Sequence, residues 1–193
     1  LPQVSLSIVE AMSHVLIETL ARGEVDFILC YDVPELSQVS RVAMLQDDLV
    51  LVTLPGPHKG QPIALVEALE DTLAMPEEGD SVRTLVTRTA RDLGLEVKIA
   101  HEVRSVSAMK SLVARGAASS ILPYFAVLDE VRAGTLDARP ITMPALRRTL
   151  FLASDQRSRY RSEAGLTGAV RASLSGLIEQ LGPLAHPLWV RTA

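Results

Sequence analysis

The chain contains a single cysteine, Cys30, among its 193 residues, so it cannot form an intramolecular disulfide. It has no positively charged start followed by an apolar run and a small-residue cleavage site. No apolar stretch approaches the roughly 18 residues of a membrane-spanning helix, and the run after Val25 meets Asp26 and Asp32. We therefore expect a cytoplasmic protein that does not span a membrane.

Signals for catalysis, metal binding and cofactors are also scarce. No two of the four histidines stand four residues apart, the spacing of a helical metal pair, and no second cysteine can join Cys30. The chain has no Gly-x-Ser-x-Gly elbow, no Gly-x-Gly-x-x-Gly and no phosphate-binding loop that ends in Gly-Lys-Ser/Thr. We expect no enzyme activity, no metal and no cofactor. The four histidines are His14, His58, His101 and His186.

Positive charge is not concentrated anywhere in the chain. The net charge is −4, the pI is about 5.6, and the arginines are scattered, so a basic surface for nucleic acid is not indicated. Any DNA contact must therefore come from another segment. Hydrophobic residues at 48% and charged residues at 22% are ordinary values for a folded globular chain.

What the chain does have is an alternation of strand-like and helix-like segments, which is typical of an α/β protein with largely parallel sheets. Val4, Leu6 and Ile8 alternate with polar residues as in a strand, a helix follows until Gly23, and residues 25–31 form a buried strand. Further strands are predicted at residues 49–54, 73–75, 97–103, 119–122, 140–142 and 150–153. Further helices are predicted at residues 65–69, 81–93, 105–116, 125–133 and 163–181.

The same pattern predicts two lobes. We place the first crossing after the short apolar stretch that ends at residue 75, and residues 150–153 carry the chain back. The first lobe then comprises residues 1–73 and 152–193, and the second comprises residues 74–151. The apolar stripe of the last helix is expected to cover the first lobe.

Two motifs resemble the effector-binding domain of LysR-type transcriptional regulators. One is Leu16-x3-Leu20-x2-Gly23-x2-Asp26 followed by an apolar strand, and the other is residues 112–123 (LVARGAASSILP), where a helix ends at glycine and a strand runs into proline. The order and spacing of the other segments agree along nearly the whole chain. The opening residues 4–10 also resemble the branch of this family that controls nitrogen assimilation.

The resemblance implies a fold, a function and partners. The fold is two Rossmann-like lobes joined by two crossover strands, as in type 2 periplasmic binding proteins. The function is to sense a small-molecule effector between the lobes, within a homo-oligomer (a dimer or tetramer) that contacts DNA through an amino-terminal winged helix-turn-helix and also contacts RNA polymerase. That DNA-binding domain and the first strand and helix of the fold are absent here, so we expect the sequence to be a fragment.

Helix starts near the expected cleft provide the candidate effector-binding residues. The Gly79-Asp80-Ser81 turn opens a helix whose free N–H groups and dipole favour a carboxylate, sulfate or phosphate, although the charge of Asp80 opposes an anion. For each such residue the alternative is simple capping. Pro123 ends a strand at the edge where ligands bind in open α/β sheets. The other candidates, by the same helix-start argument, are Ser13, Ser105 and Ser107.

One departure from the family and two alternative functions remain open. Ala118 stands where family members commonly carry a second glycine near the cleft. The first alternative is a periplasmic-type solute-binding protein of a transporter, which has a similar two-lobed fold. The second is an enzyme of two α/β lobes, which the lack of paired acid, base or metal groups disfavours.

Overall fold

The computed structural model describes residues 5, 7–11, 13–156 and 163–189. The helices are α1 (Ser13–Ala21), α2 (Leu65–Ala68), α3 (Ser81–Asp92), α4 (Val106–Ala114), α5 (Leu128–Ala133) and α6 (Glu163–Leu181). Strands β1 to β5 are Phe27–Tyr31, Val39–Thr53, Ile63–Ala64, Leu73–Met75 and Ile99–Glu102. Strands β6 to β9 are Ser119–Pro123, Asp137–Thr142, Arg147–Asp155 and Ala185–Pro187. Short 3-10 helices span Tyr124–Val127 and Gly182–Leu184.

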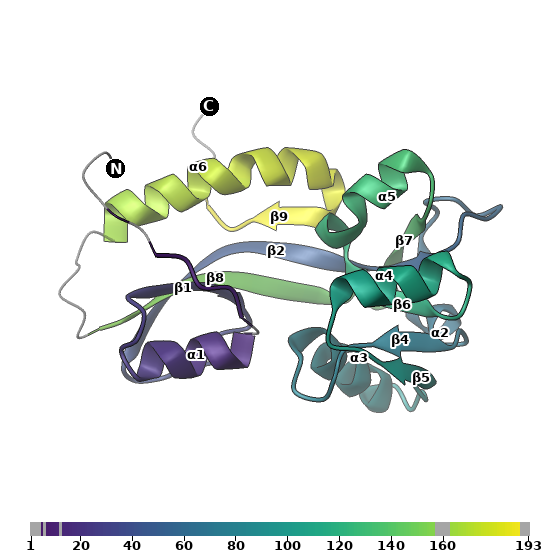
Figure 1. The fold of residues 1–193 in the computed structure, drawn as a ribbon, viewed down its shortest axis with the longest axis horizontal. Coiled ribbons are helices and arrows are strands. Elements are labelled where there is room, and N and C mark those ends of the chain that lie inside the picture. Colours follow the sequence, from purple (N-terminus) through teal and green to yellow (C-terminus); the bar gives the residue numbers. More distant parts are fainter. Residues whose placement is uncertain (1–4, 6, 12, 157–162, 190–193) are drawn as a thin grey trace.

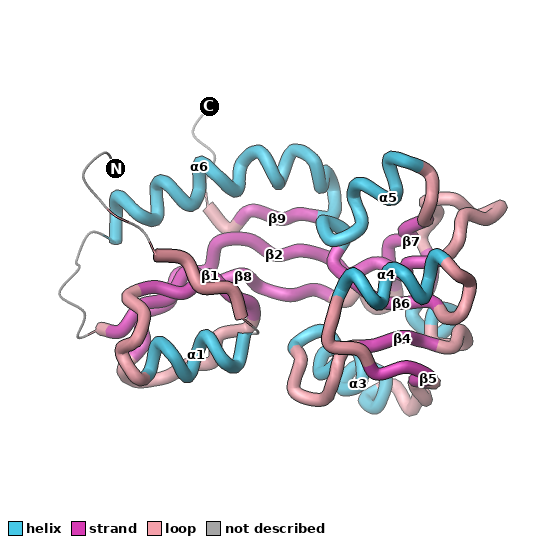
Figure 2. The backbone as a smooth tube through the Cα atoms, in the orientation of Figure 1, coloured by secondary structure: helices cyan, strands magenta, loops and turns pink. Residues whose placement is uncertain are grey.

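Two strands, β2 and β8, run through the middle of the molecule (Figure 1). The first part of β2 pairs with β8 from Val39↔Asp155 to Asp48↔Arg147, and β8 also pairs with β1. The second part of β2 pairs with β6 and β7. The strands therefore form two sheet regions that share β2, which gives the two-lobed α/β fold predicted from the sequence (Figure 2).

The expectation of largely parallel sheets was wrong. Among the described strands, only the β3–β7, β4–β5 and β4–β6 pairs are parallel. The pairs that β2 forms with β6, β7, β8 and β9 are all antiparallel. The reason is the length of β2, because one 15-residue strand provides the pairing surface for both lobes and its neighbours return alongside it.

The two crossings between the lobes follow from the strand pairing. Asp48 is the last residue of β2 that pairs with β8, and Leu49 pairs with Pro123 of β6. The backbone N–H of Leu49 donates to the carbonyl of Leu146 at 2.8 Å, one residue before β8 begins. The division at residues 73 and 151 stays a prediction. We propose that the chain passes between the two sheet regions at residues 48–49 and 146–147, where the pairing partners of β2 change.

Each sheet region buries both of its faces, and alternate residues of a strand point to opposite faces. In the first lobe, one face packs against α6 through Leu150 and Leu152, and the other packs against α1 through Ala153. The last helix therefore covers the first lobe as predicted, with Leu174 and Ile178 buried in this contact.

The second lobe is built in the same way from the far end of β2. Leu49 and Leu51 face α3, whereas Val50 and Val52 face α4 and α5. Met109 of α4 is buried on the second of these faces. In the described part of the chain, no helix is long and apolar enough to cross a bilayer.

The strand predicted near the amino terminus is not present in its described residues. Residues 5 and 7–11 have no strand structure, and Ile8 is 87% exposed, whereas Val4 and Leu6 lie outside the described residues. An alternating pattern forms a strand only beside a neighbouring strand, and β1 pairs with β8 alone among the described strands. The pattern was present, but its described residues pair with no described strand.

Candidate functional site

The start of α3 forms one wall of a cleft between the lobes. Asp80 caps the helix as predicted, because the backbone N–H of Val82 donates to Asp80 Oδ1 at 2.8 Å. Gly79 precedes the cap with a φ of +91°, a backbone conformation that other residues rarely adopt. The turn therefore directs the first residues of α3 toward the opposite lobe.

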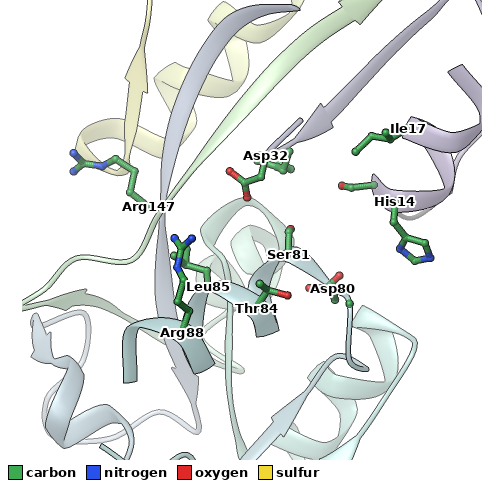
Figure 3. A pocket seen from close by; sticks show the side chains of 12 residues that line it. His14, Ile17, Asp32, Asp80, Ser81, Thr84, Leu85, Arg88 and Arg147 are labelled. Carbon is green, nitrogen blue, oxygen red and sulfur yellow. The ribbon is translucent and has the colours of Figure 1, made fainter. Parts of the chain in front are cut away.

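The cleft encloses a cavity of about 330 Å³ (Figure 3). One side comes from α1 and the end of β1, and the other comes from α3 and the turn before it. This volume lies at the lower end of the range for small-molecule sites, roughly 300–1,000 Å³. The cavity is lined by Ser13, His14, Ile17, Tyr31, Asp32, Gly79, Asp80, Ser81, Thr84, Leu85, Arg88 and Arg147.

The structure brings three of the six candidate residues together. Ser13 lies across the cavity from Asp80 and Ser81, one residue on the first lobe and two on the second. The side chains of Ser13 and Ser81 form no hydrogen bond with any residue that the structure describes. Their role as effector ligands stays a prediction, and their position in one cavity supports it.

The other three candidates lie outside this cavity. Ser105 caps α4, where the backbone N–H of Ala108 donates to its hydroxyl at 3.4 Å. Ser107 borders a second cavity of about 310 Å³. Pro123 is buried in β6 opposite Leu49. Of these three, Ser105 makes the capping contact that was weighed as its alternative, whereas the Ser107 hydroxyl caps no described helix and Pro123 is the last residue of β6.

The second cavity, bordered by Ser107, lies between α4 and the segment around α5. Its charged groups, Lys110 and Glu130, form an ion pair at 2.6 Å. The hydrogen bond from Lys110 lowers the pKa of Glu130 below its usual value. Because Lys110 and Glu130 already neutralise each other, neither charge is free to bind a charged ligand in this cavity.

Several lining residues escaped the sequence analysis. Asp32 follows the carboxyl end of β1, the same kind of position that singled out Pro123, so this signal was available. Thr84 and Arg88 stand three and seven residues after Ser81, so helical periodicity places them on one face. Nothing in the sequence pattern indicates that Arg147 borders the cleft, because its position depends on the crossing of β8.

Two pairs of opposite charges link the crossover strands beside the cleft. Arg147 donates to both carboxylate oxygens of Asp48, at 2.6 and 3.2 Å, and His186 Nε2 lies 3.1 Å from Asp48 Oδ2. Burial by itself would raise the pKa of Asp48, but the hydrogen bonds from Arg147 and His186 outweigh it and lower the pKa. The Arg147 guanidinium therefore binds Asp48 and does not offer its charge to a ligand in the cavity.

The neighbouring pair lies on the other face of the strands and is more deeply buried. Arg148 donates to Asp47 Oδ2 at 3.1 Å, and the two side chains are 5% and 3% exposed. Tyr31 donates its hydroxyl hydrogen to the same oxygen at 3.3 Å, and its ring lies 3.6 Å below the Arg148 guanidinium. Burial raises the pKa of Asp47 despite the charge of Arg148. Because Tyr31 also lines the cavity, this pair supports its wall.

Cys30 and the histidines form no reactive or metal-binding group in the described residues. Cys30 is 3% exposed, and burial, with a smaller contribution from the charge of Asp32, raises the pKa of its thiol to about 11. A thiol in this state is protonated near neutral pH and is a poor nucleophile. No three His, Cys, Asp or Glu side chains of the described chain lie close enough to hold a metal ion.

Comparison with known proteins gives the family. Residues 1–172 match the model of the LysR substrate binding domain. The chain belongs to this family. The LysR substrate binding domain described here is 23% identical to the HTH-type transcriptional regulator BbuR of Bordetella bronchiseptica, over 96% of this chain and 58% of that protein.

Two further relatives of the LysR domain are informative about its fold and about the nitrogen-assimilation branch of the family. The regulatory domain of CcmR from Synechocystis PCC6803, solved in complex with 2-PG, matches with a TM-score of 0.77 at 18% identity, over 89% of this chain and 84% of that one. The nitrogen assimilation regulatory protein nac of Escherichia coli K12 is 25% identical over 84% of this chain and 53% of that protein. Assignment to the nitrogen branch therefore has only weak support.

The chain spans just over half the length of these curated regulators. Both are transcription regulators, so the matches favour a regulatory domain over the solute-binding protein of a transporter.

Proposed function

We propose that this domain senses a small molecule held in the cleft between its lobes and passes the signal to a DNA-binding domain of the complete regulator. The observation that carries the proposal is the cavity lined by residues of both lobes, where Ser13 and Ser81 stand on opposite sides with hydroxyls that bond to no described residue. A ligand that contacts both lobes stabilises one relative arrangement over others, and such a differential affinity is what shifts a conformational equilibrium. The CcmR domain, whose fold is similar, was solved with 2-PG bound.

The same proposal includes the partners of the domain. The complete regulator binds DNA in the cytoplasm through an amino-terminal winged helix-turn-helix, assembles as a dimer or tetramer and contacts RNA polymerase. The family membership and the names of the relatives support this part. The domain itself has no catalytic role in the proposal.

Thermal unfolding of the full-length regulator against small carboxylates, sulfate, phosphate and nitrogen metabolites tests the cleft. A ligand at 100 times its dissociation constant raises the free energy of unfolding by about 2.7 kcal/mol. Ser81→Leu is expected to abolish this gain by filling the cleft, and Ser107→Leu is the control because Ser107 lies outside it. If no compound stabilises the protein, or if Ser81→Leu leaves the gain intact, the proposed sensing site is wrong.

A further inference from the structure

Opposite charges face each other across the cleft without touching. Asp32 comes from the first lobe and Arg88 from the second, and both line the cavity. In Figure 3 the Asp32 carboxylate and the Arg88 guanidinium extend toward the same space, whereas Arg147 and the ring of His14 point away. No ion pair joins Asp32 to Arg88 in the described structure. The space between them can therefore receive a ligand that pairs with each.

Asp32 is held in place by its backbone and by one carboxylate oxygen. Its φ is +54°, which is uncommon for a residue other than glycine, and its backbone N–H donates to the carbonyl of Thr149 at 2.9 Å. The backbone N–H of Thr149 donates in turn to Asp32 Oδ1 at 3.3 Å. Within the described residues Oδ2 has no partner, so a fixed carboxylate presents a free oxygen to the cleft.

Arg88 is the uncommitted cation of the cleft. It forms no hydrogen bond or ion pair with any other described side chain. Its neighbour in the helix, Arg83, is bound to Glu78 and Glu102, and Arg147 is bound to both oxygens of Asp48. Because Arg147, the other arginine that lines the cavity, already has a partner, Arg88 is available for an acidic group of a ligand.

The overall charge of the cavity excludes a simple polyanion as its best ligand. Asp32 and Asp80 bring two carboxylates to the cavity, and Arg88 is the lining arginine that is not already paired with a described residue, because Arg147 is bound to Asp48. A sulfate or dicarboxylate beside Arg88 would face the free oxygen of Asp32, and unpaired like charges oppose binding. A ligand with one charge of each sign would satisfy both walls.

We propose that the effector is a small molecule that carries a carboxylate and a protonated amino group, as a free α-amino acid does. Arg88 binds its carboxylate in the two-pronged manner that a guanidinium allows, and Asp32 Oδ2 accepts hydrogen bonds from its ammonium group. Ile17 and Leu85 provide apolar surface for the ligand's side chain. This inference rests on the proposed function, since it assigns the ligand class of the same cleft.

The test is isothermal titration calorimetry of the full-length regulator with the standard α-amino acids. For any amino acid that binds, two analogues are measured beside it, the carboxylic acid without the amino group and the amine without the carboxylate. Sulfate and phosphate complete the panel. We expect at least one amino acid to bind, and both of its analogues to bind at least about tenfold more weakly, because each leaves one charged wall unpaired.

Matched variants connect the two charges of the ligand to the two side chains. Arg88→Gln is expected to weaken the amino acid by about tenfold or more while leaving the amine analogue unaffected. Asp32→Asn is expected to weaken the amino acid similarly while leaving the carboxylic acid analogue unaffected or tighter. The controls are Arg91→Gln on the exposed part of α3 and Asp26→Asn before β1, neither of which lines the cavity.

The outcomes separate the ligand class from the proposed function. If sulfate, phosphate or a carboxylic acid binds more tightly than every amino acid and Ser81→Leu abolishes that binding, the ligand class is wrong and the sensing function stands. If both charge variants bind the amino acid as the wild type does, the assignment of Arg88 and Asp32 is wrong. If nothing binds, or binding survives Ser81→Leu, both proposals fail.

Discussion

At the scale of single residues, the most costly feature of this domain is the buried pair of Asp47 and Arg148. Taking two charges out of water costs several kcal/mol per ion, and a single contact at 3.1 Å recovers only part of it. Asp47 Oδ1 and Arg148 Nε are buried without a partner in the described structure, so the pair is not fully satisfied. It lies where β2 and β8 leave the first lobe, so it favours one arrangement of the crossover strands more than it favours folding.

The losses from removing the two members of this pair are therefore not expected to add. Asp47→Asn leaves the Arg148 charge buried without a counter-ion and should lower the free energy of unfolding by about 3 kcal/mol. Arg148→Met is the other single variant, and the double variant Asp47→Asn/Arg148→Met should lose less than the sum of the two single losses. Urea unfolding measures all three, with Glu24→Gln in the exposed Arg22–Glu24 pair as the control. Additive losses would show that the two charges are not coupled.

The adjacent Asp48 predicts a pH dependence of stability. Its pKa is lowered in the folded protein by the hydrogen bonds from Arg147 and His186, which together outweigh its burial. A carboxyl whose folded pKa is depressed contributes stability above its unfolded pKa of about 3.9, and this contribution is lost as the pH falls through the folded value. Below pH 4, Asp48→Asn should therefore lose stability less steeply than the wild type.

Unfolding free energies measured from pH 6 down to pH 2.5 test this difference in slope. Asp26→Asn is the control, because Asp26 is exposed and forms no ion pair with the described residues. Equal slopes for the wild type and Asp48→Asn would contradict the expectation.

At the scale of elements, the sequence specified the ends of helices well. Capping was the alternative weighed for Asp80 and Ser105, and both accept a backbone hydrogen bond at the start of their helix. Gly116 was predicted to end α4 and has a φ of +68°. These features depend on local chemistry, since a cap and its N–H donor lie within three residues of each other.

The strength of the first cap can be predicted from its geometry. Asp80→Ala should lower the free energy of unfolding by about 1 kcal/mol, because its hydrogen bond to Val82 is short and the carboxylate sits at the positive end of α3. Ser105→Ala should cost less, because its hydrogen bond to Ala108 is 3.4 Å long. Chemical denaturation measures the free energy of unfolding of both variants. Ser107→Ala is the control, because the Ser107 hydroxyl caps no described helix. A loss for Ser105→Ala that exceeds the loss for Asp80→Ala would contradict this ranking.

The strands were harder to predict because their partners lie far away in the sequence. The apolar run of residues 49–54 was recognised, but the first ten residues of β2 were missed. That half carries the charged residues Asp47 and Asp48, whose partners Arg148 and Arg147 come from a distant segment and cannot be read locally.

At the scale of the whole molecule, family resemblance and helix chemistry singled out three of the twelve residues that line the cavity. Ser13, Asp80 and Ser81 could be selected because helix starts are visible in a sequence, and their role as effector ligands stays a prediction. Asp32, Arg88 and Arg147 were missed because a charged residue in a loop, on a helix or in a strand is usually solvated. Only the crossing of β2 and β8 brings these three to one cavity.

If the crossings lie at residues 48–49 and 146–147, the two lobes should move as separate bodies. Spin labels at Glu18 on α1 and Arg91 on α3 report the distance between the lobes, and both positions are exposed. A cleft ligand found by thermal unfolding should narrow or shift this distance distribution, because contact with both lobes favours one arrangement. Pulsed electron resonance measures it in a Cys30→Ala background.

The control for this measurement is a label pair inside the second lobe, at Arg91 and Arg115. Its distance should not change with ligand, since α3 and α4 pack on opposite faces of the same sheet region. A change in both pairs would mean that the ligand rearranges the second lobe internally. A change in neither pair would mean that ligand binding does not move the lobes relative to each other. The effector signal would then have to reach the DNA-binding domain through the protein surface around the cleft rather than through the crossover strands.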